Sequence, residues 1–184
     1  MTNKKSCPLA QVYRLLGSGP VVLVTTCRGG RANVMPMAWH TMLDFMPPLV
    51  GCVIGEQNYT FAILRATGEC VLNVPTVELA AKVQACGSTS GRKVDKFKAF
   101  GLTPAPGKVV KAPLIEECYA SLECKVVDRR LMTKYNFFIL EVVKAWIDPR
   151  QKRPRTIHHQ GEGLFMVAGR TIRVRAPGIS SAKA

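Results

Sequence analysis

The sequence lacks the motifs by which several common protein classes are recognised. Neither GxGxxG nor GxxxxGKS/T occurs in it, so we do not expect a nucleotide to be held as in Rossmann or P-loop proteins. None of its seven cysteines forms a CxxC pair, which excludes zinc-ribbon and thioredoxin spacing. No apolar run approaches the roughly 20 residues that span a bilayer, so no transmembrane helix is expected.

Acidic residues are scarce. The chain has 12 Asp and Glu against 26 Lys and Arg, which gives a formal net charge of +14. Such a surface attracts phosphates, whether in nucleic acids, nucleotide cofactors or acidic partner proteins. No helix-turn-helix, zinc finger or aromatic-rich RNA-binding motif accompanies the charge, so nucleic acid is not the favoured partner. The odd number of scattered cysteines and the absence of a signal-type apolar segment lead us to expect a cytoplasmic protein.

Histidine is also scarce, since the chain contains only His40, His158 and His159. No catalytic triad is visible, and we assign no catalytic residue from the sequence. The adjacent pair at 158–159 is a possible metal ligand in isolation. We expect no metal site there, because no ligand set accompanies the pair.

What the sequence does contain is a series of short β-branched segments, which are typical of strands. We expect strands at 20–26, from about 33, and at 47–55, 69–75, 119–127, 135–147 and 164–174. Helical spacing is found at 58–68, at 76–87 and briefly at 13–19. Gly68 should end the first of these, and Thr76 and Gly87 should cap and end the second. Because the strands do not alternate with helices, the pattern predicts a mainly β fold, a β-barrel with inserted helices.

Several segments carry finer expectations. The strand at 135–147 is apolar on both faces for much of its length, so we expect it to be covered on both sides. Along 119–127 apolar and polar residues alternate, which places them on opposite faces. The basic segment 148–159 should be a solvated loop, and 169–175 should be a half-exposed strand. Three cysteines in strand-like runs are interpreted as small buried hydrophobes: Cys52, Cys70 and Cys124.

Six segments together resemble the flavin reductase-like family of FMN-binding split barrels, and most of all its flavoredoxin branch. In chain order they are PVVLVTTCRGG, NVMPMAW, PPLV, YTFAILRATGECVLN, CGSTSGRKVDKF and FFILEVV. Each motif alone is weak, but their shared order over about residues 12–170 is a specific signal. The resemblance implies an FMN-binding domain at 12–175, an N-terminal extension at 1–11 and a flexible tail at 176–184.

The resemblance also implies a set of residues for FMN. This cofactor needs an apolar slot for its flat ring, hydrogen-bond partners at the ring edge, and N–H groups or positive charge at its phosphate. For the ring the implied residues are Asn33, Met35, Ala38, Trp39, His40, Thr41, Met42, Asn136 and Phe165. For the phosphate they are Asn58, Tyr59 and Thr60, which begin a predicted helix, and Ser90, Arg92 and Lys96. Without the resemblance, the methionines and aromatics could equally be core residues and the cations a solvated face.

Two functional versions follow from the resemblance. In one, the protein is a flavin reductase in which hydride passes from NAD(P)H to bound FMN. In the other, FMN carries electrons between proteins, and the basic surface docks an acidic redox partner. The rival hypothesis is a non-enzymatic basic β-barrel that binds nucleic acid or an acidic protein. The family resemblance further implies a homodimer with FMN near the subunit interface.

One departure from the family bears on mechanism. The family usually carries a histidine just before its long strand, where this chain has Tyr135 and Asn136. Asparagine donates and accepts hydrogen bonds but does not titrate. A proton-handling role at this position is therefore not carried over.

Overall fold

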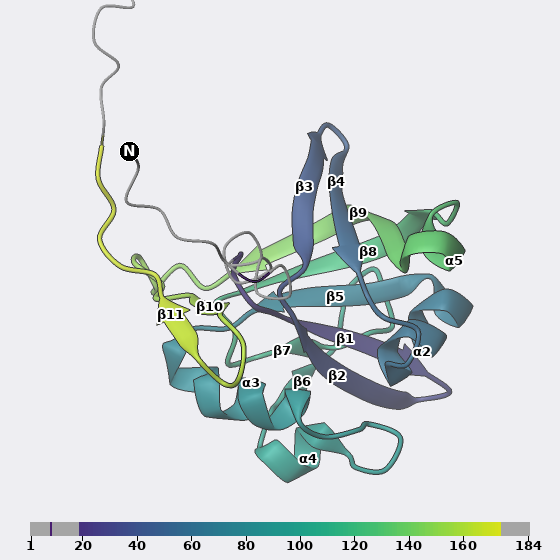
Figure 1. The fold of residues 1–184 in the computed structure, drawn as a ribbon, viewed down its shortest axis with the longest axis horizontal. Helices are drawn as coiled ribbons and strands as arrows, with labels where there is room; N and C mark the ends of the chain where they lie inside the picture. The colour runs from purple at the N-terminus through teal and green to yellow at the C-terminus, as the bar shows by residue number, and fades with distance from the viewer. Residues whose placement is uncertain (1–7, 9–18, 174–184) are drawn as a thin grey trace, which may run out of the picture.

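A seven-stranded antiparallel sheet forms the body of the protein in the computed structural model, which describes residue 8 and residues 19–173 (Figure 1). The strand order is β2-β1-β5-β8-β9-β4-β3. The bounds are β1 Val22–Arg28, β2 Arg31–Met37, β3 His40–Phe45, β4 Pro48–Val53, β5 Glu69–Val74, β8 Ala120–Asp128 and β9 Phe137–Ile147. Two short ribbons pair β6 Pro104–Ala105 with β7 Leu114–Ile115, and β10 Ile157–His159 with β11 Phe165–Val167. The expected mainly β fold is confirmed.

Short helices lie around the sheet. They are α2 Tyr59–Thr67, α3 Ala80–Gly87, α4 Lys96–Phe100, α5 Met132–Tyr135 and the 3₁₀ helix η2 Val77–Leu79. Helix α2 packs on β1, whereas α3 and α4 pack along β2 (Figure 1). The β3–β4 hairpin stands away from the rest of the sheet. In the described part of the chain, no helix is long and apolar enough to cross a membrane.

Strand β1 lies between two hydrophobic cores, which explains the apolar run that leads into it and forms its first half. Val22 and Val24 face one core, which also contains Phe138 of β9. Leu23, together with Val21 just before the strand, faces the other core, which lies under α3. Alternate side chains of a strand point to opposite faces, so the part of a strand that is buried on both sides is mainly apolar.

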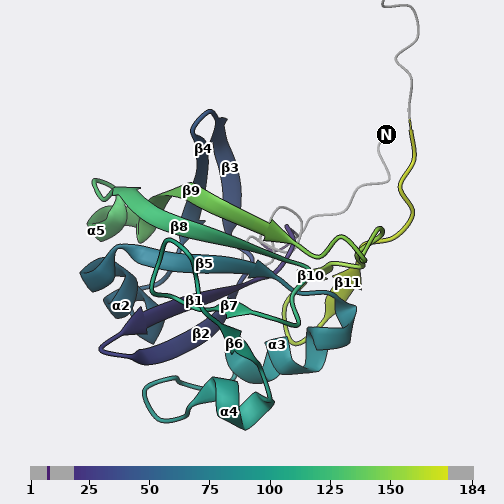
Figure 2. The ribbon, with the colours of Figure 1, turned by 180° about the vertical axis from the view of Figure 1, so that it is seen from behind.

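The chain that connects α4 to β8 runs over one face of the sheet (Figure 2), and Ser121 and Glu123 of β8 are buried. The Glu123 carboxylate has no exposed surface and accepts hydrogen bonds from the backbone N–H groups of residues 108–110 at 2.6–3.1 Å. It also accepts one from Trp146 Nε1 at 2.8 Å. Burial alone would raise the pKa of Glu123, but these donors outweigh burial and lower the pKa. Glu123 therefore holds this connection in place and does not face water, whereas Lys125 on the same face is exposed.

The helix boundaries agree in part with expectation. Gly68 ends α2 in the left-handed conformation at φ 70°, and its N–H donates to Leu64 O at 2.8 Å, as predicted. Thr76 occupies the N-cap position as expected, but of the 3₁₀ helix η2 that leads into α3, and its side chain makes no capping bond. Gly87 is the last residue of α3 and is followed by Ser88 in right-handed conformation, so it does not end the helix as a left-handed glycine.

Three expectations, for two strands and one loop, require correction. The expectation of a strand at 169–175 is wrong for the residues that the structure describes. Strand β11 ends at Val167, and residues 168–173 form no strand. The loop expected at 148–159 ends early, since its last three residues form β10. The last three residues of β9, 145–147, are exposed, so that strand is not covered on both sides throughout. The helix expected at 13–19 lies almost wholly outside the described residues.

The cysteine expectation is confirmed. Cys52, Cys70 and Cys124 have no exposed surface and are free thiols. Cys70 and Cys124 lie opposite each other on β5 and β8. Burial and the neighbouring Cys124 raise the pKa of Cys52 above its usual range, which keeps this thiol protonated at neutral pH.

Candidate functional site

A polar cavity of about 240 Å³ opens beside β2. Three segments converge on it: the start of α2, the loop from α3 toward α4, and the strand β2 itself. Its lining residues are Asn33, Met35, Gln57, Asn58, Tyr59, Thr60, Gly87, Ser88, Thr89, Ser90, Gly91 and Lys96. Most of these are small or polar, which suits a hydrogen-bonding ligand better than an apolar one.

The N-terminus of α2 faces this cavity without an anionic side chain of its own. Asn58 occupies the N-cap position in extended conformation, but its side chain makes no capping bond and donates to Gly55 O at 3.2 Å. The first turn contains no acidic residue. The first N–H groups of a helix have no partner within the helix and carry partial positive charge. This end of α2 is therefore suited to an anion.

A buried amide at the cavity wall has one unused atom. Asn33 is 4% exposed, and its Nδ2 donates to Thr60 Oγ1 at 2.8 Å. Its Oδ1 has no hydrogen-bond partner among the described residues. Gly91 lies against this oxygen so closely that a Cβ at position 91 would overlap it. An unpaired buried acceptor costs about 1–3 kcal/mol, so a ligand hydroxyl that donates to Asn33 Oδ1 would be favoured.

The cavity floor contains a buried cation. Lys96 is 5% exposed, and its Nζ donates to the carbonyl oxygen of Cys86 at 2.6 Å. Burial lowers the pKa of Lys96, although the nearby Cys86 side chain opposes the shift. Burial likewise raises the pKa of Cys86 to about 11, and Lys96 partly offsets this. A bound anion would supply the full negative partner that Lys96 lacks in this structure.

Two arginines surround Tyr59 at the cavity rim. The guanidinium of Arg92 lies 4.9 Å from the Tyr59 ring centroid, and that of Arg31 lies 6.0 Å from it. Arg31 Nη2 also donates to Gly91 O at 2.9 Å, which ties β2 to the loop. Sequence reasoning missed Arg31. The signal was available, because Arg31, Asn33 and Met35 are alternate residues of one strand and share a face.

A second cavity, of about 380 Å³, lies beside the first and is mainly apolar. Its apolar walls come from Val21, Pro36, Met37, Val83 and Phe165. Its polar lining residues are Gln84, Ser88, His159 and Glu162. Gly87 and Ser88 line both cavities, so the two share a rim at the end of α3.

The structure brings together about half of the residues predicted for the site. Those that line the polar cavity are Asn33, Met35, Asn58, Tyr59, Thr60, Ser90 and Lys96. Arg92 stacks on Tyr59 at the rim, and Phe165 lines the apolar cavity. Some cavity residues that sequence reasoning did not select are polar residues without a local signal, such as the exposed Gln57 and Ser88 and the half-buried Thr89.

The remaining predicted residues lie elsewhere. Ala38, Trp39, His40, Thr41 and Met42 run from the end of β2 into β3, at the base of the projecting hairpin. Trp39 and Met42 are each 54% exposed, and His40 Nε2 forms a hydrogen bond with Pro20 O at 2.7 Å. Asn136 ends α5 in left-handed conformation. Its carbonyl oxygen accepts a hydrogen bond from Ile54 N at 3.0 Å, in the segment that leads to α2.

Comparisons with known proteins agree with this fold. Residues 16–164 match the model of the flavin reductase like domain. YddH of Escherichia coli K12 is 32% identical over 178 residues, covering 89% of this chain and 94% of YddH. The FMN-binding domain of a flavin reductases-like enzyme from Shewanella baltica is 30% identical, with a TM-score of 0.79 over 93% of this chain and 97% of that one.

A third similarity concerns the fold alone. Flavoredoxin of Desulfovibrio vulgaris has a TM-score of 0.81 over 100% of both chains, at 24% identity. The mostly β architecture thus matches the flavin reductase-like split barrels. Because the family model covers most of the described sheet and the polar cavity lies within it, the chain belongs to the flavin reductase-like family.

Proposed function

We propose that this protein is an FMN-dependent oxidoreductase that holds FMN non-covalently across the two adjoining cavities. The observation that carries the proposal is the pairing of a polar, cation-lined cavity with a mainly apolar one at a shared rim. FMN has the same division, with a phosphate and a hydroxylated chain at one end and a flat ring at the other. The FMN-binding neighbour from Shewanella baltica supports the choice of flavin.

The polar cavity fits the phosphate end. The open N-terminus of α2 offers N–H groups, and Lys96 offers a buried positive charge. Asn33 Oδ1 offers an acceptor for a hydroxyl of the chain that links phosphate and ring. Among residues 8 and 19–173, each of these features lacks a complete partner, which is expected of groups that serve a ligand.

We assign the ring to the apolar cavity and the adjacent segment 38–42. When bound, FMN supplies the capacity to accept and pass on a hydride or two electrons. The protein's own groups orient the ring and shield it from water: Met37 and Phe165 provide apolar contact, and we place segment 38–42 beside the polar edge of the ring. Trp39 and Met42 complete the enclosure only if something covers them, because both are half exposed in the single chain.

We propose that a second copy of the chain provides this cover. The β3–β4 hairpin carries Phe45 and Met46 at 87% and 86% exposure, with Leu43 at 45%. Exposed apolar side chains clustered on one projecting hairpin are typical of a protein–protein contact. A homodimer formed through this hairpin would place the interface next to the proposed flavin ring.

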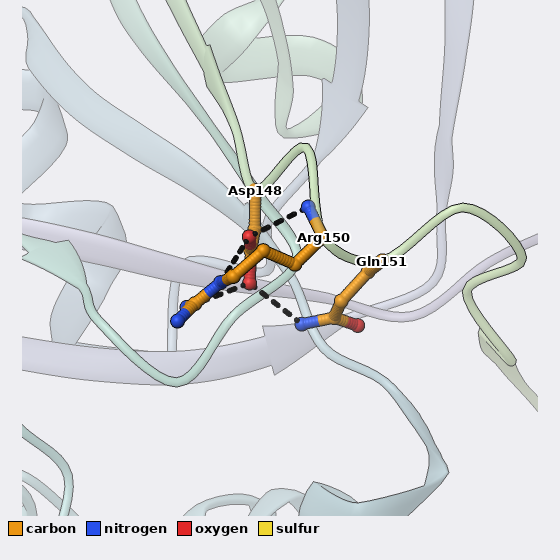
Figure 3. Close-up of polar contacts among 3 residues, drawn as sticks. All are labelled: Asp148, Arg150 and Gln151. Carbon is orange, nitrogen blue, oxygen red and sulfur yellow. Dashed lines mark hydrogen bonds and ion pairs between the residues drawn. The ribbon is translucent and has the colours of Figure 1, made fainter.

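The electron donor distinguishes the two versions of the function, and in the first version it is a nicotinamide nucleotide. The alternative donor or acceptor is an acidic protein, and one observation supports it. In the loop after β9, Arg150 is turned back onto Asp148, with Nε at 2.9 Å from Oδ1 (Figure 3). Lys152 and Arg153 beyond it are exposed, and neither side chain forms an ion pair within the described part of the chain. These two charges are free to meet an acidic surface.

The decisive experiment is the absorption spectrum of purified protein loaded with FMN, before and after anaerobic addition of NADH or NADPH. Bands near ~370 and ~450 nm that stay with the protein on gel filtration would support the flavin site. Bleaching by either nucleotide supports the reductase, and bands that persist with both favour the protein-to-protein carrier. Protein that retains no FMN would refute the proposal.

A further inference from the structure

Two ionisable residues line the apolar cavity, and the proposed flavin site has so far given them no role. They are His159 of β10 and Glu162 of the turn before β11. The other lining residues come from β1, β2, α3 and β11 and are uncharged. A titratable ring at an otherwise apolar wall is a candidate for proton exchange with a ligand.

The position of His159 is set by the strand that carries it. Ile157 has no exposed surface and is part of the core under α3. His159 is two residues further along β10 and so shares this inward face, whereas His158 points to the other face. His159 pairs with Phe165 across the ribbon, and their rings lie 5.2 Å apart at 56°. The imidazole is therefore held against the wall where we place the flavin ring.

The turn that follows brings a carboxylate to the same cavity. Gly161, Glu162 and Gly163 all have positive φ, at 95°, 53° and 75°. Glycine adopts this conformation at little cost, so the two glycines make the tight turn possible. Glu162 lines the cavity together with His159.

We propose that His159 takes up a proton when the bound flavin is reduced. The inference rests on the proposed function, because it requires FMN in the apolar cavity. Reduction adds two electrons and one proton to the ring, which leaves it with one more negative charge. His159 then takes one proton from solvent, and its positive charge balances the added negative charge. The reductant is a nicotinamide nucleotide in the proposed reaction and dithionite in the experiment below.

The other candidate groups are already committed. His40 Nε2 is hydrogen bonded to Pro20 O. Lys96 Nζ donates to Cys86 O in the polar cavity. Asn136 does not titrate. Of the two ionisable residues that line the apolar cavity, His159 is the one whose ring packs against Phe165, and we assign proton exchange at the flavin ring to it.

The test is the midpoint potential of bound FMN as a function of pH, measured on the full chain by titration with dithionite. For a two-electron couple, one proton per reduction changes the potential by about 30 mV per pH unit, and two protons change it by about 60 mV. Wild type should show a slope near ~60 mV over part of the range from about pH 5 to 8, where histidines change charge. His159→Gln should show a slope near ~30 mV over that same part.

The control is His158→Gln, which changes the neighbouring histidine on the opposite face and should keep the wild-type slope. An unchanged slope in His159→Gln would overturn the inference. NMR of wild type labelled at histidine gives a second readout that needs no variant: the His159 ring should become more protonated on flavin reduction at fixed pH, and no change would contradict the proposal. Wild type that binds no FMN would instead refute the proposed function, so the two failures are distinguishable.

Discussion

Replacing Lys96 with methionine isolates the role of the buried cation in the polar cavity. The change keeps an unbranched side chain of similar length but removes the charge and the donor to Cys86 O. A hydrogen bond to a charged group contributes about 1.5–3 kcal/mol. At about 1.4 kcal/mol per factor of ten, Lys96→Met should weaken FMN binding by about 10- to 150-fold.

Riboflavin provides the matched ligand, because it has the same ring and hydroxylated chain without the phosphate. Its affinity should change less than about threefold if Lys96 contacts only the phosphate. Both affinities can be measured by quenching of flavin fluorescence. Lys98→Met removes an exposed lysine from the same helix and should leave both affinities unchanged. An equal loss for FMN and riboflavin, or no loss for either, would refute the phosphate assignment.

The same variant should not unfold the protein. Loss of the bond to Cys86 O destabilises the fold, while removal of a desolvated ammonium stabilises it, so we expect a net change within about 1 kcal/mol. Burial lowers the pKa of Lys96 in the folded state below its ordinary value of 10.5. The cost of burying the charged Lys96 ammonium is therefore present below the pKa of Lys96 in the folded protein. It disappears as pH rises from that pKa toward 10.5. Wild type should gain stability relative to Lys96→Met over that interval, as measured by urea denaturation.

Three further changes test other parts of the structure. Gly91→Ala should weaken FMN binding about tenfold by calorimetry, because the new Cβ displaces Asn33 Oδ1; unchanged affinity would refute the role of that oxygen. Glu123→Gln should lower the free energy of unfolding by about 3 kcal/mol in urea, since an amide cannot accept from all four donors. Because the pKa of Glu123 is lowered, wild type should lose this stabilisation as pH falls below about 4.5. Phe45→Ser with Met46→Ser should give a monomer by light scattering with an unchanged circular dichroism spectrum; a wild-type monomer would contradict the hairpin interface.

Local sequence patterns predicted a strand well where both of its faces are buried. They also predicted the end of a helix well where a glycine terminates it. The apolar β-branched run of β1 and the left-handed Gly68 are examples, because each depends on only a few neighbouring residues. Helix α4 has five residues within a basic segment and shows no apolar stripe that periodicity could detect. The burial of Glu123 was also not predictable, because its donors lie at residues 108–110 and at Trp146.

The site was predicted in part for a related reason. Asn58, Tyr59 and Thr60 were identified because a helix start has a sequence signal and a general affinity for anions. Lys96 was identified only by family resemblance, since no local pattern distinguishes it from the exposed Lys98. The apolar cavity is built from five separate parts of the chain, and His159 enters it through a strand of three residues. Such convergence depends on tertiary packing, which no window of sequence contains.

The position of β1 between two cores has a consequence for how the protein opens. Val22 and Val24 belong to one core and Leu23 to the other, so neither core can separate from β1 without disturbing its pairing with β2 and β5. Local opening should therefore be confined to outlying parts such as the β3–β4 hairpin and the β10–β11 ribbon. In native-state hydrogen exchange, the amides of β1 should exchange only through global unfolding, and the two cores should melt in a single step.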